Sequence, residues 1–103
     1  MLQYEIYVPL NYGNGQPIEE ALLNQTKEEL VCKFQGLTVY PPALAPAEGF
    51  WVQQGQMILD EIIILRVITR EDADEFLISY KEVLERRFQQ DEVLVVKYPA
   101  QIL

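Results

Sequence analysis

The 103-residue chain has no histidine and a single cysteine. Histidine is the commonest metal ligand and the usual proton-transfer group near neutral pH, so Ser-His and Cys-His catalysis and histidine metal sites are excluded. The one cysteine, Cys32, excludes a disulfide within the chain, and we interpret it as a small apolar residue on a helix. We therefore expect no metal and no cofactor.

Positive charge is also scarce. The chain has eight Lys and Arg residues and 16 Asp and Glu residues, which gives a formal net charge of -8. Nucleic-acid binders carry a basic footprint, and anionic membranes attract basic segments, so we expect neither kind of partner. No apolar run reaches the roughly 18 residues of a membrane-spanning helix. Residues 1–5 also lack the features of a secretory leader, which predicts a cytoplasmic protein.

What the chain has in abundance is apolar residues, which make up half of it. Its length suits a single domain over residues 1–103 with one core. The most apolar and β-branched stretch is residues 60–69, which predicts a strand buried on both faces at the centre of a sheet.

Periodicity predicts the other elements. Alternation at residues 4–8 and the apolar run at 93–98 indicate strands, and a long strand covers 57–68. Residues 37–40 form a short strand that the proline-rich segment 41–46 interrupts and residues 50–53 resume before a turn at 54–56. Apolar stripes predict helices over 18–34, with Gly36 as its stop signal, and over 73–88, after a capping box that begins at Thr69.

The resulting order is strand-helix-strand-strand-helix-strand. Right-handed crossovers leave few ways to arrange it. We predict an α+β, ferredoxin-like βαββαβ sandwich: a four-stranded antiparallel sheet in the order 4-1-3-2 with both helices on one face.

Three segments resemble a known family. They are Phe-Gln-Gly-Leu-Thr-Val at 34–39, Gly-Phe-Trp at 49–51 followed by Gly55, and Arg-Phe-Gln-Gln-Asp-Glu-Val-Leu at 87–94. In this pattern the chain is similar to DUF3574, a small bacterial family of unknown function, over residues 22–96. The acidic position of that family before the third strand matches either Asp60 or Glu61. The resemblance implies a ferredoxin-like fold and no established activity.

The two faces of the sheet differ in what covers them. On the long strand, Ile63, Leu65 and Val67 share one side, which the two helices can cover. The other side carries Ile62, Ile64, Arg66 and Ile68. We place Glu5, Tyr7, Val93, Val95 and Lys97 on this second side as well, because charged side chains should point away from the helices. A contiguous apolar patch of this kind usually marks a partner or ligand surface.

These patterns favour a non-enzymatic binding module that forms a homo-oligomer, most simply a dimer, through the open face and binds a partner or a small ligand. The interface or ligand candidates are Tyr7, Trp51, Ile62, Ile64, Arg66, Ile68, Val95 and Lys97. Two alternatives stay open for single residues: Trp51 as a core residue, and Arg66 with Glu5 and Lys97 as a structural ion pair. The alternative function is a small cofactor-free enzyme of the dimeric α/β-barrel type, working with Tyr7, Arg66 and Trp51 in a pocket on the same face.

Overall fold

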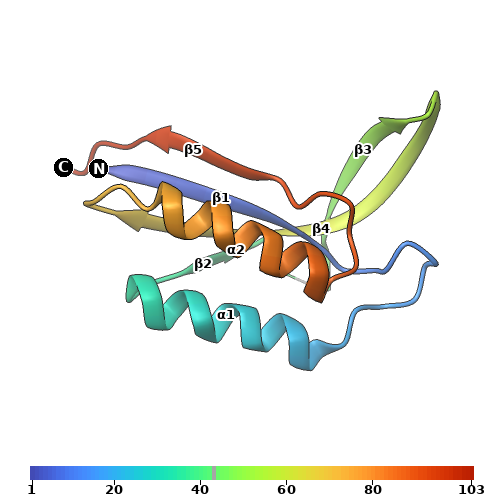
Figure 1. Cartoon of the computed structure of the whole chain (residues 1–103), viewed down its shortest axis with the longest axis horizontal. Coiled ribbons are helices and arrows are strands. Elements are labelled where there is room, and N and C mark those ends of the chain that lie inside the picture. Colours follow the sequence, from blue (N-terminus) through green and yellow to red (C-terminus); the bar gives the residue numbers. More distant parts are fainter. Residues whose placement is uncertain (43) are drawn as a thin grey trace.

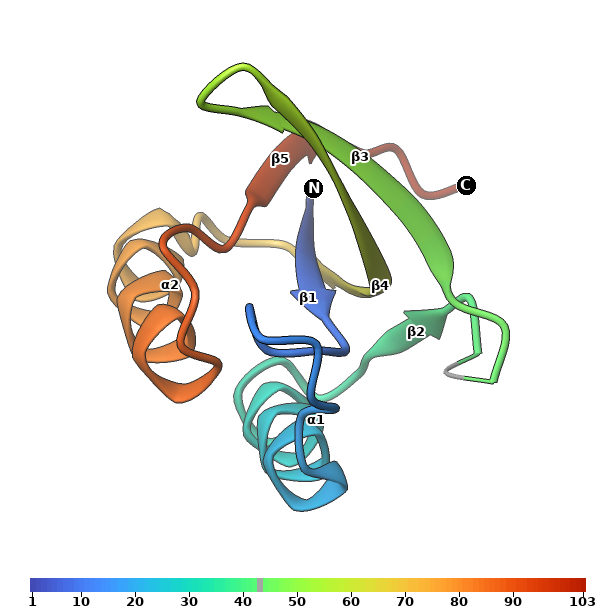
Figure 2. The ribbon, with the colours of Figure 1, turned by 90° about the vertical axis from the view of Figure 1, so that its right-hand side faces the viewer.

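One antiparallel sheet of five strands has both helices on the same face (Figures 1 and 2). The computed structural model describes residues 1–42 and 44–103. The elements in chain order are β1 (Leu2–Pro9), α1 (Glu20–Phe34), β2 (Thr38–Tyr40), β3 (Ala47–Gln53), β4 (Gln56–Thr69), α2 (Asp74–Arg87) and β5 (Val95–Pro99). The strand order β2-β4-β1-β5 is the expected 4-1-3-2 order, so the predicted ferredoxin-like fold is confirmed.

The core lies between the sheet and the helices. The register pairs Tyr4 with Val67, Ile6 with Leu65, and Val8 with Ile63, and all six side chains face α1 and α2. Leu30 of α1 and Leu84 of α2 are fully buried against them, as is Phe88 just after α2. Burial of this apolar surface is the main stabilising contribution to the fold.

The ends of the helices differ from the predictions. α1 ends at Phe34 because Gln35 adopts a left-handed φ of 63°, whereas we expected Gly36 to provide the stop. Its predicted first residue, Ile18, lies before the helix and is buried in the core. Thr69 closes a turn with Glu71 instead of capping α2.

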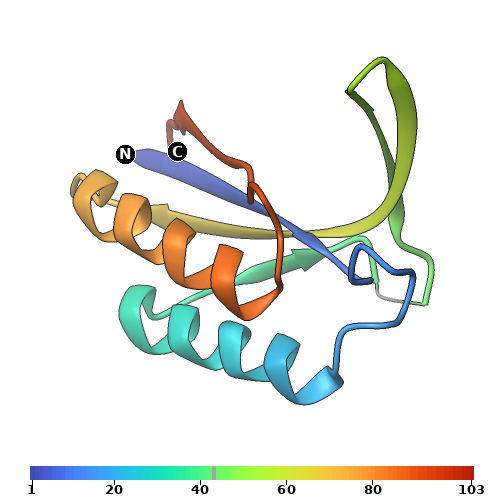
Figure 3. The ribbon, with the colours of Figure 1, turned by 45° about the vertical axis from the view of Figure 1, so that its right-hand side comes forward.

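The largest departure from the predicted fold is a fifth strand. β3 is a separate strand rather than the continuation of β2, and the proline-rich segment between them includes residue 43, which lies outside the described residues. β3 pairs only with the first half of β4, from Ala47↔Ile62 to Gln53↔Gln56. This two-stranded hairpin, residues 47–62, rises from the sheet on the side away from the helices (Figures 1 and 3). We call it the arm.

The tip of the arm is a tight turn. Gln54 and Gly55 connect the two strands, and their φ angles of 51° and 78° are both positive. Two positive φ angles are characteristic of the type I′ turn, whose twist matches the twist of the flanking strands. Gly55 tolerates this backbone conformation because it has no Cβ atom.

The face assigned to β5 was wrong. Val95 lies opposite Ile6 and packs against the core, and Val93 is buried there too. Lys97 lies opposite Tyr4, and its Nζ is 3.0 Å from Asp74 Oδ2. β5 is an edge strand, so its lysine can extend past the sheet to the acidic start of α2. The prediction assumed that every charged side chain on a strand points away from the helices, which does not hold at an edge. On β5 itself, Val96 and Tyr98 therefore lie on the open face.

Candidate functional site

The centre of the open face holds a buried carboxylate. Glu5 is 3% exposed, and its Oε2 accepts hydrogen bonds from Nε and Nη2 of Arg66 at 3.1 and 2.9 Å. Tyr40 and Tyr98 donate their hydroxyl groups to the same carboxylate. Glu5 and Arg66 are direct cross-strand neighbours on β1 and β4, which is why the two side chains meet.

These contacts hold the cluster in one charge state. Burial alone would raise the pKa of Glu5, but the hydrogen bonds from Tyr40, Tyr98 and Arg66 outweigh it and hold that pKa below its usual range. The bond to Glu5 raises the pKa of Tyr98, and burial together with the bond to Glu5 raises that of Tyr40. At neutral pH, Glu5 is therefore ionised and both tyrosines are protonated. The arrangement is a satisfied ion pair rather than a proton-transfer site.

Apolar side chains surround this cluster. Ile62 is buried, Ile64 is half-buried, and Ile68 is 43% exposed. They lie opposite Pro9, Tyr7 and Gln3 of β1, on the side of the sheet that the helices leave open. The open face thus combines an apolar surface with one internally neutralised ion pair.

The arm is apolar on both of its faces. Cross-strand pairing puts Phe50 with Leu59 and Val52 with Met57 on the outer face, and each of the four is more than half exposed. Glu48 and Glu61 form the next pair along the same face, where the arm joins the sheet. The inner face carries the pair of Trp51 and Ile58.

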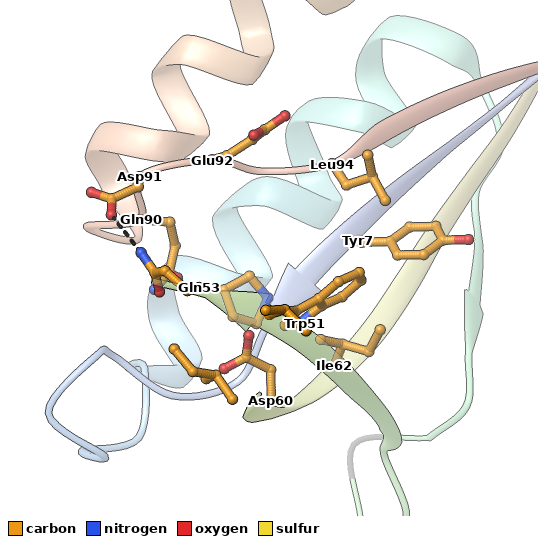
Figure 4. A pocket seen from close by; sticks show the side chains of 12 residues that line it. Tyr7, Trp51, Gln53, Asp60, Ile62, Gln90, Asp91, Glu92 and Leu94 are labelled. Atoms are coloured by element: carbon orange, nitrogen blue, oxygen red, sulfur yellow. Dashed lines mark hydrogen bonds between the residues drawn. The ribbon is translucent and has the colours of Figure 1, made fainter. Parts of the chain in front are cut away.

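A cleft of about 420 Å³ lies between the inner face of the arm and the sheet (Figure 4). Its walls come from β1, β3, β4 and the segment after α2. The lining residues are Tyr7, Pro9, Trp51, Val52, Gln53, Ile58, Asp60, Ile62, Gln90, Asp91, Glu92 and Leu94. Gln53 Nε2 reaches Asp91 Oδ2 at 3.5 Å, so the tip of the arm contacts the segment after α2 across the cleft. This volume is within the range of small-molecule pockets.

Trp51 is oriented by a glycine. Gly49 lies two residues earlier on the same face of β3, and the indole ring packs over its Cα. A Cβ atom at position 49 would lie 2.9 Å from Cζ2 of Trp51, closer than side-chain atoms pack. Gly49 therefore permits the orientation in which the indole forms a wall of the cleft.

The structure brings some of the predicted site residues together. Tyr7, Trp51 and Ile62 line the cleft, and Ile64, Arg66 and Ile68 follow on the adjoining open face. Val95 and Lys97 lie on the helix side of the sheet. Arg66, held by Glu5, is outside the described lining of the cleft, so the three residues of the enzyme alternative do not share one pocket.

Sequence reasoning missed two features of the site. One is the outer face of the arm. Its signal was the run Phe50-Trp51-Val52, which is apolar at successive positions and therefore on both faces of a strand. The other is the acidic part of the cleft, Asp60, Asp91 and Glu92, which depends on how the arm bends back over the sheet. Within residues 1–42 and 44–103, no three His, Cys, Asp or Glu side chains are placed to hold a metal ion. None of the helices in that part is long and apolar enough to span a membrane.

The fold is that of a group of solved structures. The chain is similar to the divalent cation tolerance protein CutA1 from Thermus thermophilus, with 17% identity and a TM-score of 0.63 over 97% of this chain and 84% of that one. It is also similar to CutA1 from Oryza sativa, with 16% identity and a TM-score of 0.65 over 97% and 79% of the two chains. A phage SAM lyase in complex with S-methyl-5′-thioadenosine has 17% identity and a TM-score of 0.66 over 94% and 79%.

These similarities correct the family resemblance. No family model matches the chain, and no curated protein matches it in sequence. The structural neighbours are CutA1 proteins and a SAM lyase, so the assignment to DUF3574 was wrong. The quoted segments coincide with the connection from α1 to β2, with the arm, and with the connection from α2 to β5. At these identities the comparisons establish the ferredoxin-like fold.

Proposed function

We propose that this chain is a self-associating binding module. A second copy covers the open face and the outer face of the arm. A small molecule binds in the cleft between the inner face of the arm and the sheet. The observation that carries the proposal is the outer face of the arm, with its four exposed side chains Phe50, Val52, Met57 and Leu59.

A two-stranded hairpin is marginally stable alone in water, and this one is apolar on both faces. Its inner face contributes to the cleft, whereas the four large apolar side chains of its outer face stay more than half exposed in the described chain. Exposed apolar patches on this scale mark interaction surfaces, and full burial of each large side chain contributes about 1.5–3 kcal/mol. A covered arm is therefore much more stable than a free one.

A second copy supplies a complementary surface. The open face offers Ile64 and Ile68 beside Arg66, whose side chain is 33% exposed. The outer face of the arm offers four apolar side chains beside Glu48 and Glu61. Docking one surface on the other would bury apolar residues on both sides, because the guanidinium between them is already neutralised by Glu5. A largely apolar surface of the same kind is therefore the partner that this face fits best.

Light scattering coupled to size exclusion tests the assembly. We expect the unmodified chain to elute with at least twice its mass of 12.0 kDa at micromolar concentration. Replacing Val52→Glu and Met57→Glu together should give a 12.0 kDa monomer with unchanged circular dichroism, because two charges then oppose burial of the outer face.

The matched control is Ile78→Glu on α2. Ile78 is also a large exposed apolar residue, but it lies on a helix, away from the arm and the open face. This variant should keep the mass of the unmodified chain. A monomeric unmodified chain, or an unchanged mass for the double variant, would show that the arm does not mediate self-association.

A further inference from the structure

The cleft beside the arm has two chemically different ends. Figure 4 shows the indole of Trp51 near the middle, with Tyr7, Ile62 and Leu94 towards one end. Asp60 and Asp91 lie towards the other end. A ligand that fits such a cleft has an apolar body and a polar or charged group.

The charge at the polar end is negative. Asp60, Asp91 and Glu92 contribute three carboxylates, and the described lining contains no Lys or Arg. One lysine approaches from outside: Lys81 Nζ is 3.7 Å from Glu92 Oε1. Lys81 makes closer contacts with Glu85, at 2.5 Å, and with the carbonyl of Val93, at 2.8 Å. Glu92 is therefore partly compensated, whereas no Lys or Arg in the described residues forms an ion pair with Asp60 or Asp91, and a cationic ligand would neutralise these two charges.

An aromatic wall adds to this preference. The faces of tryptophan and tyrosine rings attract cations, and tryptophan does so most strongly. Cations with methyl groups around the charge, such as quaternary ammonium and sulfonium groups, can lie against an indole without first losing a tightly held hydration shell. Gly49 makes room for the indole of Trp51 to line the cleft before any ligand arrives.

We infer that the cleft binds an organic cation with an apolar body, of the quaternary ammonium or sulfonium class. This inference rests on the proposed role of the cleft as a ligand site, and it names the class of that ligand. Trp51 is the wall against which the cationic group lies, and Asp60 of the neighbouring strand β4 supplies a carboxylate in the same lining.

Tryptophan fluorescence provides a direct assay, because Trp51 is the only tryptophan in the chain. The probes are choline, as a minimal quaternary ammonium group, and 3,3-dimethylbutan-1-ol, which has the same shape without the charge. We expect choline to change the fluorescence saturably, with an affinity about tenfold above that of the alcohol. Asp60→Asn should lower the choline affinity about fivefold and leave the weak alcohol affinity unchanged.

Two further variants complete the test. Glu28→Gln removes the same charge from the exposed surface of α1 and should leave both affinities unchanged. Gly49→Ala should weaken binding of choline because the new Cβ displaces the indole. Equal affinities for the two probes would overturn the cation class while leaving a ligand site in place. No saturable change with choline, or an unchanged choline affinity in Asp60→Asn, would overturn the inference itself.

Light scattering on the same samples separates this inference from the proposed self-association. A monomeric chain that still prefers choline would retain the cation site and refute the assembly. An assembled chain with no preference for choline would refute the cation site and retain the assembly.

Discussion

A glutamate bound by an arginine and by tyrosine lies on each side of the sheet, but one cluster connects helices and the other connects strands. On the helix side, Glu29 of α1 accepts two hydrogen bonds from Arg87 of α2, at 2.7 and 3.0 Å, and one from Tyr80 at 2.7 Å. On the open side, Glu5 of β1 accepts its bonds from Arg66 of β4 and from tyrosines of β2 and β5. The first cluster ties two helices together across the sequence, and the second ties strands within one layer.

That difference shows what each face needs. The helix-side cluster lies between two helices that already cover their face of the sheet. In it, the ring of Tyr80 stacks on Phe76 and belongs to the core. The open-side cluster neutralises its own charges within the plane of the sheet, and no buried polar side chain in the described chain lacks a partner. The side chains around this cluster are apolar, so the open face as a whole is a surface that a partner can cover. The comparison predicts that the helix side determines folding and the open side determines association.

The largest effect is expected in the helix-covered core. Phe88→Ala removes a fully buried ring and should lower the free energy of unfolding by about 3–5 kcal/mol. Ile68→Ala, on the open face, should cost less than about 1 kcal/mol when both are measured in the monomeric Val52→Glu, Met57→Glu background. Denaturant unfolding followed by circular dichroism gives both values. Equal losses would mean that the open face is already covered within one chain.

A smaller loss of stability is expected when the charged cluster of the open face, rather than the apolar core, is altered. Glu5→Gln keeps the shape of the side chain but removes the charge that Arg66, Tyr40 and Tyr98 stabilise. We expect a loss of about 2 kcal/mol at neutral pH, below the full value for a buried ion pair because Arg66 is partly exposed. The measurement is the free energy of unfolding of both proteins across a pH series.

The sign of the pH dependence follows from the lowered pKa of Glu5. The unfolded carboxyl titrates near its ordinary value of 4.5, and the folded one titrates below it. The stabilisation is therefore complete above the unfolded pKa and is lost as the pH falls through the folded pKa. The gap between the original chain and Glu5→Gln should close on acidification below 4.5. A gap that stays constant over this range would mean that the ionised form of Glu5 is not what the cluster stabilises.

Much of the fold follows from periodicity alone. The long β4 and the two helices were predicted within a few residues, because a continuous apolar, β-branched run indicates a buried strand and a helical stripe reflects burial on one side of a helix. The arm was not predicted as a separate unit. Residues 50–53 were correctly predicted to be extended, but only the pairing register shows that β3 has one partner strand and leaves the plane of the sheet.

The site was predicted in part, for a related reason. Tyr7, Trp51 and Ile62 were chosen as aromatic or apolar residues without a helix to cover them, and they do meet in the cleft. Asp60 entered the sequence analysis only through the family resemblance and was not among the predicted site residues. The bend of the arm makes Asp60 line the same cleft as Asp91, which lies 31 positions later in the chain. Local patterns contain no information about that approach.

The smallest effect should come from the residue whose face was wrongly predicted. Lys97 forms ion pairs with Asp74 and Asp72 at the exposed edge of the sheet, at 3.0 and 3.6 Å. Exposed ion pairs contribute little, because water and salt screen them and the long side chain loses freedom when it is fixed. We expect Lys97→Ala to leave the free energy of unfolding and the assembled mass unchanged. Arg66→Ala should lower the stability measurably and weaken self-association, because it leaves the buried carboxylate of Glu5 without its ion-pair partner in the open face. If Lys97→Ala instead matches Arg66→Ala in both measurements, the edge of the sheet belongs to the interface, and β5 rather than the arm is where a second copy docks.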